Sequence, residues 1–192
     1  MQLIKFLWRL YVVNYAMKYF FILSLFFPAF LQAQASNEEL LEWNGSRKLS
    51  WSDYKANPDP ESDAAASTTT YLSIEYNMGN NNFGYKIKSR FSKSRSWGVH
   101  KTAYILDHEQ GHFDIAEIFA RKLNKAMTEY RFDRKNFKQD LRKIYQEIID
   151  EKEEMQNEYD EETNHSINKT KQAEWLKKIR KMLEEYEEYA NY

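Results

Sequence analysis

The sequence contains no cysteine, so no disulfide bond can stabilise the fold. It also lacks a block of basic residues, because its 28 Lys and Arg side chains are nearly balanced by 29 Asp and Glu. This balance argues against nucleic acid as the main partner. A chain of this size must then be held by a hydrophobic core and by any metal that it binds, and 14 tyrosines and 12 phenylalanines can supply that core.

Residues 1–35 have the composition of an export signal. An apolar run from Tyr19 to Leu31 is shorter than a typical membrane-spanning helix and directly follows Lys18. It leads into Ala33-Gln34-Ala35, which matches the small-residue motif that signal peptidase recognises. We expect cleavage before Ser36 and a secreted or periplasmic protein.

Two alternatives stay open at this end of the chain. The signal is already complete from Met17 onward, which makes Met17 an alternative start. An uncleaved membrane anchor is the other alternative, because the chain is apolar almost throughout from Leu3 to Leu31. If the signal is removed, 157 residues remain (192 minus 35), which is enough for a single domain over 36–192 and too few for two.

The periodicity of apolar residues predicts an α+β fold. Two segments alternate apolar and polar residues around a Gly-Asn-Asn-Asn turn at 79–82, which predicts an antiparallel β-hairpin or small sheet. The spacing then changes to three or four residues, which predicts three long helices. The expected strands span 68–78 and 83–92, and the expected helices span about 101–127, 134–157 and 167–189.

The motif HEQGH in the first predicted helix is the feature that indicates chemistry. Residues i and i+4 lie on one helix face, so His108 and His112 can bind one zinc ion. Glu109 lies at the edge of that face, where it can hold a metal-bound water and act as general base. Gly111 allows another backbone to approach the helix, and the hairpin could supply it as a substrate-binding edge. The alternative is that these are ordinary histidines beside a solvated glutamate.

A catalytic zinc site needs a third protein ligand and one open position. We predict His165, because it lies in a polar segment that can turn back over the first helix. His100 would reach the site only if the helix began earlier, and Gly98 argues against that. Carboxylates remain open as alternatives in a His, His, carboxylate set: Asp160, Glu162, Glu147 and Asp150. Glu117 is excluded, because it points about 140° away from His112 on an unbroken helix. Among many tyrosines, we name Tyr159 as a candidate to stabilise an oxyanion.

Several further residues carry a family resemblance that covers roughly the whole segment after residue 35. They are Trp51, Tyr54, Ala66-Ser67-Thr68, Ser96-Trp97, His108 to Glu117, Arg121-Lys122-Leu123, Tyr159-Asp160, Glu162-Thr163, His165, Gln172 and Trp175. In these positions the sequence resembles a family of bacterial exported proteins, catalogued as a domain of unknown function and described as secreted zinc-dependent protease-like. The resemblance implies a zincin-like site with His108, Glu109 and His112 in their usual roles and with His165 as a further site residue. The sequence departs from the family pattern at Ser166, where glycine is usual.

These observations predict a secreted zinc metallopeptidase. Zn²⁺ is the expected cofactor, a peptide or protein is the expected substrate, and no membrane association is expected after signal cleavage. Glu109 would act as general base and then return its proton to the leaving amine. The alternatives are a catalytically inactive zinc-binding envelope or scaffold protein, and a helical interaction module in which the motif is accidental. The sequence does not specify the substrate or the oligomeric state.

Overall fold

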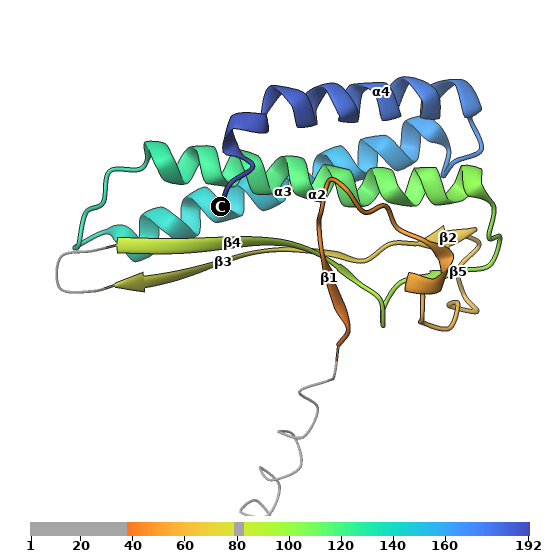
Figure 1. The fold of residues 1–192 in the computed structure, drawn as a ribbon, viewed down its shortest axis with the longest axis horizontal. Helices are drawn as coiled ribbons and strands as arrows, with labels where there is room; N and C mark the ends of the chain where they lie inside the picture. Colours follow the sequence, from red (N-terminus) through yellow and green to blue (C-terminus); the bar gives the residue numbers. More distant parts are fainter. Residues whose placement is uncertain (1–37, 79–82) are drawn as a thin grey trace, which may run out of the picture. The chain divides into compact units, whose positions relative to one another are not determined.

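A computed structural model of the chain describes residues 38–78 and 83–192. Within these residues the predicted α+β order is confirmed, because a small antiparallel sheet is followed by three helices (Figure 1). The predicted export signal at 1–35 and the turn at 79–82 lie outside the described residues. Of the described helices, none is both long and apolar enough to cross a membrane.

The main sheet has three antiparallel strands in the order β1-β4-β3. β3 (Thr70–Met78) and β4 (Phe83–Ser92) form the predicted hairpin, with Met78 opposite Phe83 at its closed end. β1 (Leu40–Glu42) adds to the other edge of β4. The alternation of side chains between the two faces explains why the hairpin was visible in the sequence, whereas β1 is too short to show a pattern.

A second, two-stranded sheet pairs β2 (Ala66–Ser67) with β5 (Trp97–Gly98). β3 was expected to begin near residue 68, but the chain leaves β2 at Ser67 and joins the main sheet only at Thr70. The two short strands lie next to the beginning of the first described helix (Figure 1).

Three helices follow the sheet along the chain: α2 (Ala103–Glu129), α3 (Phe137–Thr163) and α4 (Lys169–Glu185). α2 packs on the sheet, and α4 packs on α2 and α3 (Figure 1). α2 begins where it does because the Thr102 side chain accepts a hydrogen bond from the Ile105 amide (3.1 Å). α3 continues six residues beyond its predicted end, because the acidic run before Thr163 suggested a loop yet contains neither proline nor glycine. This extension places Asp160 on a helix rather than in a connecting segment.

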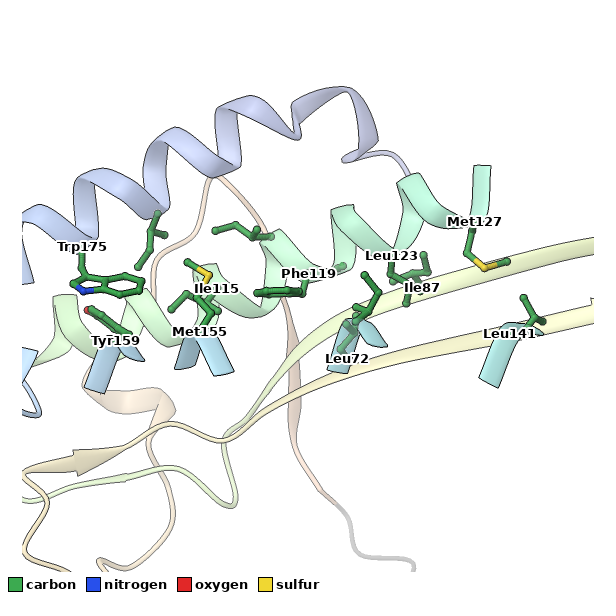
Figure 2. Close-up of a cluster of buried hydrophobic side chains, with 14 of the residues drawn as sticks. Leu72, Ile87, Ile115, Phe119, Leu123, Met127, Leu141, Met155, Tyr159 and Trp175 are labelled. Atoms are coloured by element: carbon green, nitrogen blue, oxygen red, sulfur yellow. The ribbon is translucent and has the colours of Figure 1, made fainter. Parts of the chain in front are cut away.

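α2 lies at the centre of the fold, in contact with the sheet and with the other two helices. Nine consecutive residues from Phe113 to Arg121 are buried, so this stretch is covered on all sides. Figure 2 shows how side chains from each layer meet in one core. The labelled members are Leu72 and Ile87 of the sheet, Ile115, Phe119, Leu123 and Met127 of α2, Leu141, Met155 and Tyr159 of α3, and Trp175 of α4. Such a core fixes how α3 lies against α2, and this packing positions the candidate site.

Candidate metal centre

His108 and His112, one turn apart on α2, face Asp160 on α3. The Nε2 atoms of the two histidines are 3.2 Å apart, and each lies 3.1 Å from Oδ1 of Asp160. A zinc ion with nitrogen and oxygen ligands at 2.0–2.1 Å in tetrahedral geometry requires ligand separations of about 3.3–3.4 Å. The three atoms therefore match one face of a tetrahedral site within a few tenths of an ångström. Among the described residues, no other such group of His, Cys, Asp or Glu is found.

The facing nitrogens support a cation at this position. Two imidazole nitrogens at 3.2 Å repel each other unless one carries a proton or both bind a cation. The shared carboxylate oxygen adds negative charge at the same point. The residues present therefore fit a divalent metal ion held by two imidazoles and one carboxylate, which is a set that zinc accepts.

Protonation of this group is strongly coupled when no metal is bound. Burial lowers the pKa of His108, and the hydrogen bond to Asp160 offsets this only in part. Burial acts in the same direction on His112, but the hydrogen bond and charge of Asp160 outweigh it and raise its pKa to about 9. Burial would raise the pKa of Asp160, yet hydrogen bonds from both imidazoles hold it well below its usual range. The carboxylate thus stays ionised, and a metal ion that bound here would compete with the proton on His112.

Gln156 of α3 orients the second histidine. Its side-chain oxygen accepts a hydrogen bond from Nδ1 of His112, and its amide nitrogen donates to the main-chain oxygen of the same residue (2.9 Å). Because Nδ1 carries the proton in this arrangement, Nε2 is left as the ligand atom. Nδ1 of His108 is buried and has no hydrogen-bond partner among the described residues.

Tyr159 of α3 packs against His108. Its ring stacks on the His108 ring with 4.5 Å between centroids, and its hydroxyl donates to the His108 main-chain oxygen (3.2 Å). Tyr159 is fully buried and does not line the cleft described below, so its position favours a supporting role over the oxyanion role suggested from the sequence. It is also the close neighbour of Gly111, where a Cβ would lie 2.6 Å from the tyrosine hydroxyl. The predicted close approach at Gly111 exists, but an aromatic ring of α3 makes it and not the hairpin backbone.

Glu109 is 4% exposed and faces the same cleft as the histidines. Its Oε2 atom is buried without a hydrogen-bond partner among the described residues. An unpartnered buried carboxylate oxygen is costly, so such atoms commonly mark a functional position or a bound molecule. Glu109 therefore has a free carboxylate oxygen beside the candidate ligands, and its role as general base stays a prediction.

His165 lies at the rim of the site. Its side chain is 67% exposed, and Nδ1 is 3.6 Å from Oδ1 of Asp160. It follows α3 in three successive left-handed residues, Asn164 (φ 47°), His165 (φ 49°) and Ser166 (φ 73°). The left-handed conformation at Ser166 explains physically why glycine would suit that position. The assignment of His165 as third ligand stays a prediction. Asp160 is the predicted alternative whose Oδ1 lies 3.1 Å from Nε2 of both His108 and His112.

The remaining predicted alternatives lie elsewhere. Glu162 accepts a hydrogen bond from Trp175 (3.1 Å), and Asp150 accepts one from Gln146 (2.7 Å). Glu147 lies 3.8 Å from Lys143 on the exposed side of α3. His100 is exposed and precedes α2. None of these four belongs to the compact group of His108, His112 and Asp160.

The candidate centre opens into a cleft of about 570 Å³. Residues of α2 form its floor, the chain from Ser62 to Thr70 forms one wall, and α3 from Lys152 to Asp160 forms the other. Lys152, Gln156 and Asp160 recur at every fourth residue of α3. Lys152 and Gln156 were not predicted as site residues, because the helix was expected to end before Asp160. The spacing of four residues would place all three side chains on one face of a longer helix.

The strand wall of the cleft contains main-chain groups that do not bond to the neighbouring strand. In an antiparallel pair, residues alternate between pairs that are hydrogen-bonded to each other and pairs that are not. The Val99 amide donates to the Ala65 oxygen (2.8 Å), so Ala66, opposite Gly98, is in a non-bonded pair and directs its N–H and C=O away from β5. Further along the same edge, the Leu72 oxygen accepts a hydrogen bond from Tyr145 of α3 (2.7 Å). The edge that faces α3 is thus bonded to that helix at Leu72. Within the described residues the N–H and C=O of Ala66 have no hydrogen-bond partner, and Ala66 lines the same cleft as His108 and His112.

Comparison with known proteins gives one match. A family model described as a bacterial protein of unknown function, DUF922, matches residues 34–166. No curated protein and no solved structure matches the chain. The matched segment contains HEQGH, the strand wall of the cleft, Asp160 and His165.

Proposed function

We propose that this chain, which belongs to the DUF922 family of bacterial proteins, is an exported zinc-dependent peptidase. The observation that supports this most directly is the triangle of His108, His112 and Asp160 ligand atoms, with edges of 3.1–3.2 Å, beside the unpartnered oxygen of Glu109. In this proposal the two histidines and Asp160 hold the metal. Export would depend on the signal predicted at residues 1–35.

The chemistry divides between the metal and the chain. Bound zinc would act as a Lewis acid that polarises the substrate carbonyl and lowers the pKa of a water molecule. Glu109 would accept the proton of the attacking water at its free Oε2 and then deliver it to the nitrogen of the departing amine. Gln156 and Tyr159 would keep the two histidines in place while this happens. Gln156 bonds to Nδ1 of His112, and Tyr159 stacks on the His108 ring and bonds to the main-chain oxygen of His108.

A peptide is the substrate that best suits the cleft. The free N–H and C=O groups of Ala66 can bond to an extended chain in the manner of an added strand. α3 on the opposite side, at Lys152, Gln156 and Asp160, would contact the side chains of such a peptide. Backbone pairing would hold many sequences, and the side-chain contacts would select among them.

A catalytically inactive zinc-binding protein is the second candidate. One observation favours it: Nδ1 of His165 lies only 3.6 Å from the Asp160 oxygen, so a small movement of the turn could make it a fourth protein ligand. Four protein ligands would close the site, as in structural zinc centres.

Metal analysis tests the ligand set first. We expect about one zinc per chain in the purified protein, with loss in His112→Ala and Asp160→Ala and retention in His165→Ala. Zinc lost from His165→Ala but retained by Asp160→Ala would instead make His165 the third ligand. Absence of zinc from the parent protein, even after incubation with zinc and desalting, would refute the proposed function.

Activity is tested with Glu109→Gln as the matched control, because this variant keeps the shape of the side chain and all proposed metal ligands. The parent should cleave a synthetic library of randomised peptides, with cut sites identified by mass spectrometry. Glu109→Gln should retain zinc and lose about 10²–10⁴-fold in rate. Equal cleavage by both proteins would indicate a contaminant or a different mechanism, and zinc binding without any cleavage would favour the inactive zinc-binding protein.

A further inference from the structure

Lys152 is a buried cation in the wall of the cleft. It is 5% exposed, and its Nζ lies 2.5 Å from a carboxylate oxygen of Glu153. The Glu153 side chain is itself 59% exposed and solvated, and it is the only ionic partner of Lys152 among the described residues. Charged lysines are rarely buried to this extent without a buried partner. The side chain therefore has the means to bind an anion that enters the cleft.

The position of Lys152 along the cleft follows from the helix geometry. Asp160 lies eight residues further along α3, which at 1.5 Å per residue is about 12 Å. An extended peptide advances about 3.3 Å per residue, so this distance corresponds to three or four peptide residues. Lys152 would thus meet a peptide three or four residues away from the bond held at the metal ligands.

Threonines form the opposite wall at the level of Lys152. Tyr145 of α3 is bonded to the Leu72 oxygen, and α3 runs antiparallel to β3 (Figure 1). Lys152 lies seven residues after Tyr145, so it is about 10 Å further along the helix axis. Because the strand rises about 3.3 Å per residue, this distance corresponds to about three strand residues counted back from Leu72, which places Lys152 opposite Thr69. Thr68, Thr69 and Thr70 line the cleft there. Hydroxyl and main-chain groups can position a ligand at this point but cannot neutralise the ammonium group.

We propose that Lys152 selects substrates that place a carboxylate three or four residues from the cleaved bond. The proposal rests on the proposed peptidase function and adds a substrate class to it. An incoming carboxylate would replace the solvated Glu153 oxygens as the partner of Lys152, and burial would strengthen that contact. The carboxylate can be an acidic side chain or the C-terminus of the peptide, because both offer the same group.

The test uses the randomised peptide library in two forms, one with free C-termini and one with amidated C-termini. The parent protein, Lys152→Met and Lys152→Arg are each loaded with zinc and given both libraries, and cut sites are sequenced. Lys143→Met serves as the matched control, because Lys143 lies on the same helix with its side chain 76% exposed. The same libraries are also passed over immobilised Glu109→Gln protein, with and without Lys152→Met, and the retained peptides are sequenced.

We expect Asp and Glu to be enriched about tenfold at one position three or four residues from the cut site. This enrichment should fall below about twofold in Lys152→Met and persist in Lys152→Arg and Lys143→Met. A preference that amidation abolishes would identify the C-terminal carboxylate as the ligand, and one that survives amidation would identify an acidic side chain.

The two proposals fail in different ways. Cleavage with no acidic preference, or with a preference that Lys152→Met leaves unchanged, would overturn the role of Lys152 and leave the peptidase intact. Absence of cleavage combined with Lys152-dependent retention of acidic peptides would overturn the peptidase and leave carboxylate binding standing. Absence of both would overturn both.

Discussion

Replacing Gly111 with alanine should show whether helix propensity or packing against Tyr159 decides the stability at this position. Within an isolated helix this change is favourable by about 1 kcal/mol, because glycine loses more backbone entropy on folding. Here the new Cβ would lie 2.6 Å from the Tyr159 hydroxyl and 2.9 Å from two ring carbons of the same residue. Helix propensity and packing therefore predict opposite signs.

We expect the steric conflict to outweigh the gain in helix propensity, because the Tyr159 ring is packed on both faces and cannot move away. Tyr159 is fully buried between His108 and Trp175, whose ring centroids lie 4.5 and 5.4 Å from its own. Forcing an extra methyl group into such a core costs about 1–3 kcal/mol, and steric conflict at the severe end of this range exceeds the gain in helix propensity. We expect a net loss of about 1–2 kcal/mol in the free energy of unfolding.

The displaced ring should also disturb the ligand that rests on it. His108 stacks on Tyr159 and receives its hydroxyl hydrogen bond, so a shift of the ring moves the histidine relative to His112 and Asp160. Loss of such supporting contacts commonly costs 10–100-fold in metal affinity, and we expect about tenfold.

Urea unfolding with EDTA present would measure the change in stability without metal, and competition with a chromophoric chelator would measure zinc affinity. Tyr159→Phe removes the nearest clashing atom, so the double variant should lose less stability than the sum of the two single variants. An alanine variant that is about 1 kcal/mol more stable than the parent and binds zinc equally well would refute the argument.

Two further predictions concern stability alone. Burial would raise the pKa of Asp53, but hydrogen bonds from Arg47 and Ser50 hold it below the ordinary value of 3.8, so the ionised carboxylate stabilises the fold at neutral pH and this contribution is lost as the pH falls below 3.8. Asp53→Asn should therefore flatten the decline in urea stability between about pH 4 and pH 2, and an unchanged decline would contradict this assignment. Ser166→Gly should stabilise the protein by about 0.5–1 kcal/mol, because relief of left-handed strain exceeds the entropy cost of glycine. Ser166→Ala keeps the Cβ and should give no such gain in the same thermal unfolding assay.

The parts of the fold that the sequence predicted are those with a regular pattern. The hairpin over 70–92 shows period-two alternation, and α2 shows apolar residues at every third or fourth position, so both were found near their observed bounds. The strands β1, β2 and β5 contain only two or three residues each and depend on pairing with distant segments. Local patterns carry no information about such pairing.

The sequence predicted only those residues of the candidate site that lie close together in the chain. His108, Glu109 and His112 share one turn of a helix, so their spacing alone indicated a common face. The third member depends on how α3 packs against α2, which a chemical inventory of the chain does not reveal. His165 was preferred as the remaining histidine of suitable type, whereas Asp160 is the group whose distance to both histidines is 3.1 Å.

The registration between α2 and α3 has a consequence for how this gene can change. Asp160 lies beside the histidines only because α3 continues without interruption from Tyr145, which is hydrogen-bonded to Leu72, to its last turn. Deleting one codon between Tyr145 and Asp160 would rotate every later residue by about 100° and withdraw it by about 1.5 Å. The carboxylate would then face away from α2 although no residue of the centre had been altered. Length variation in this protein should accordingly be concentrated outside that stretch of fourteen codons (146–159).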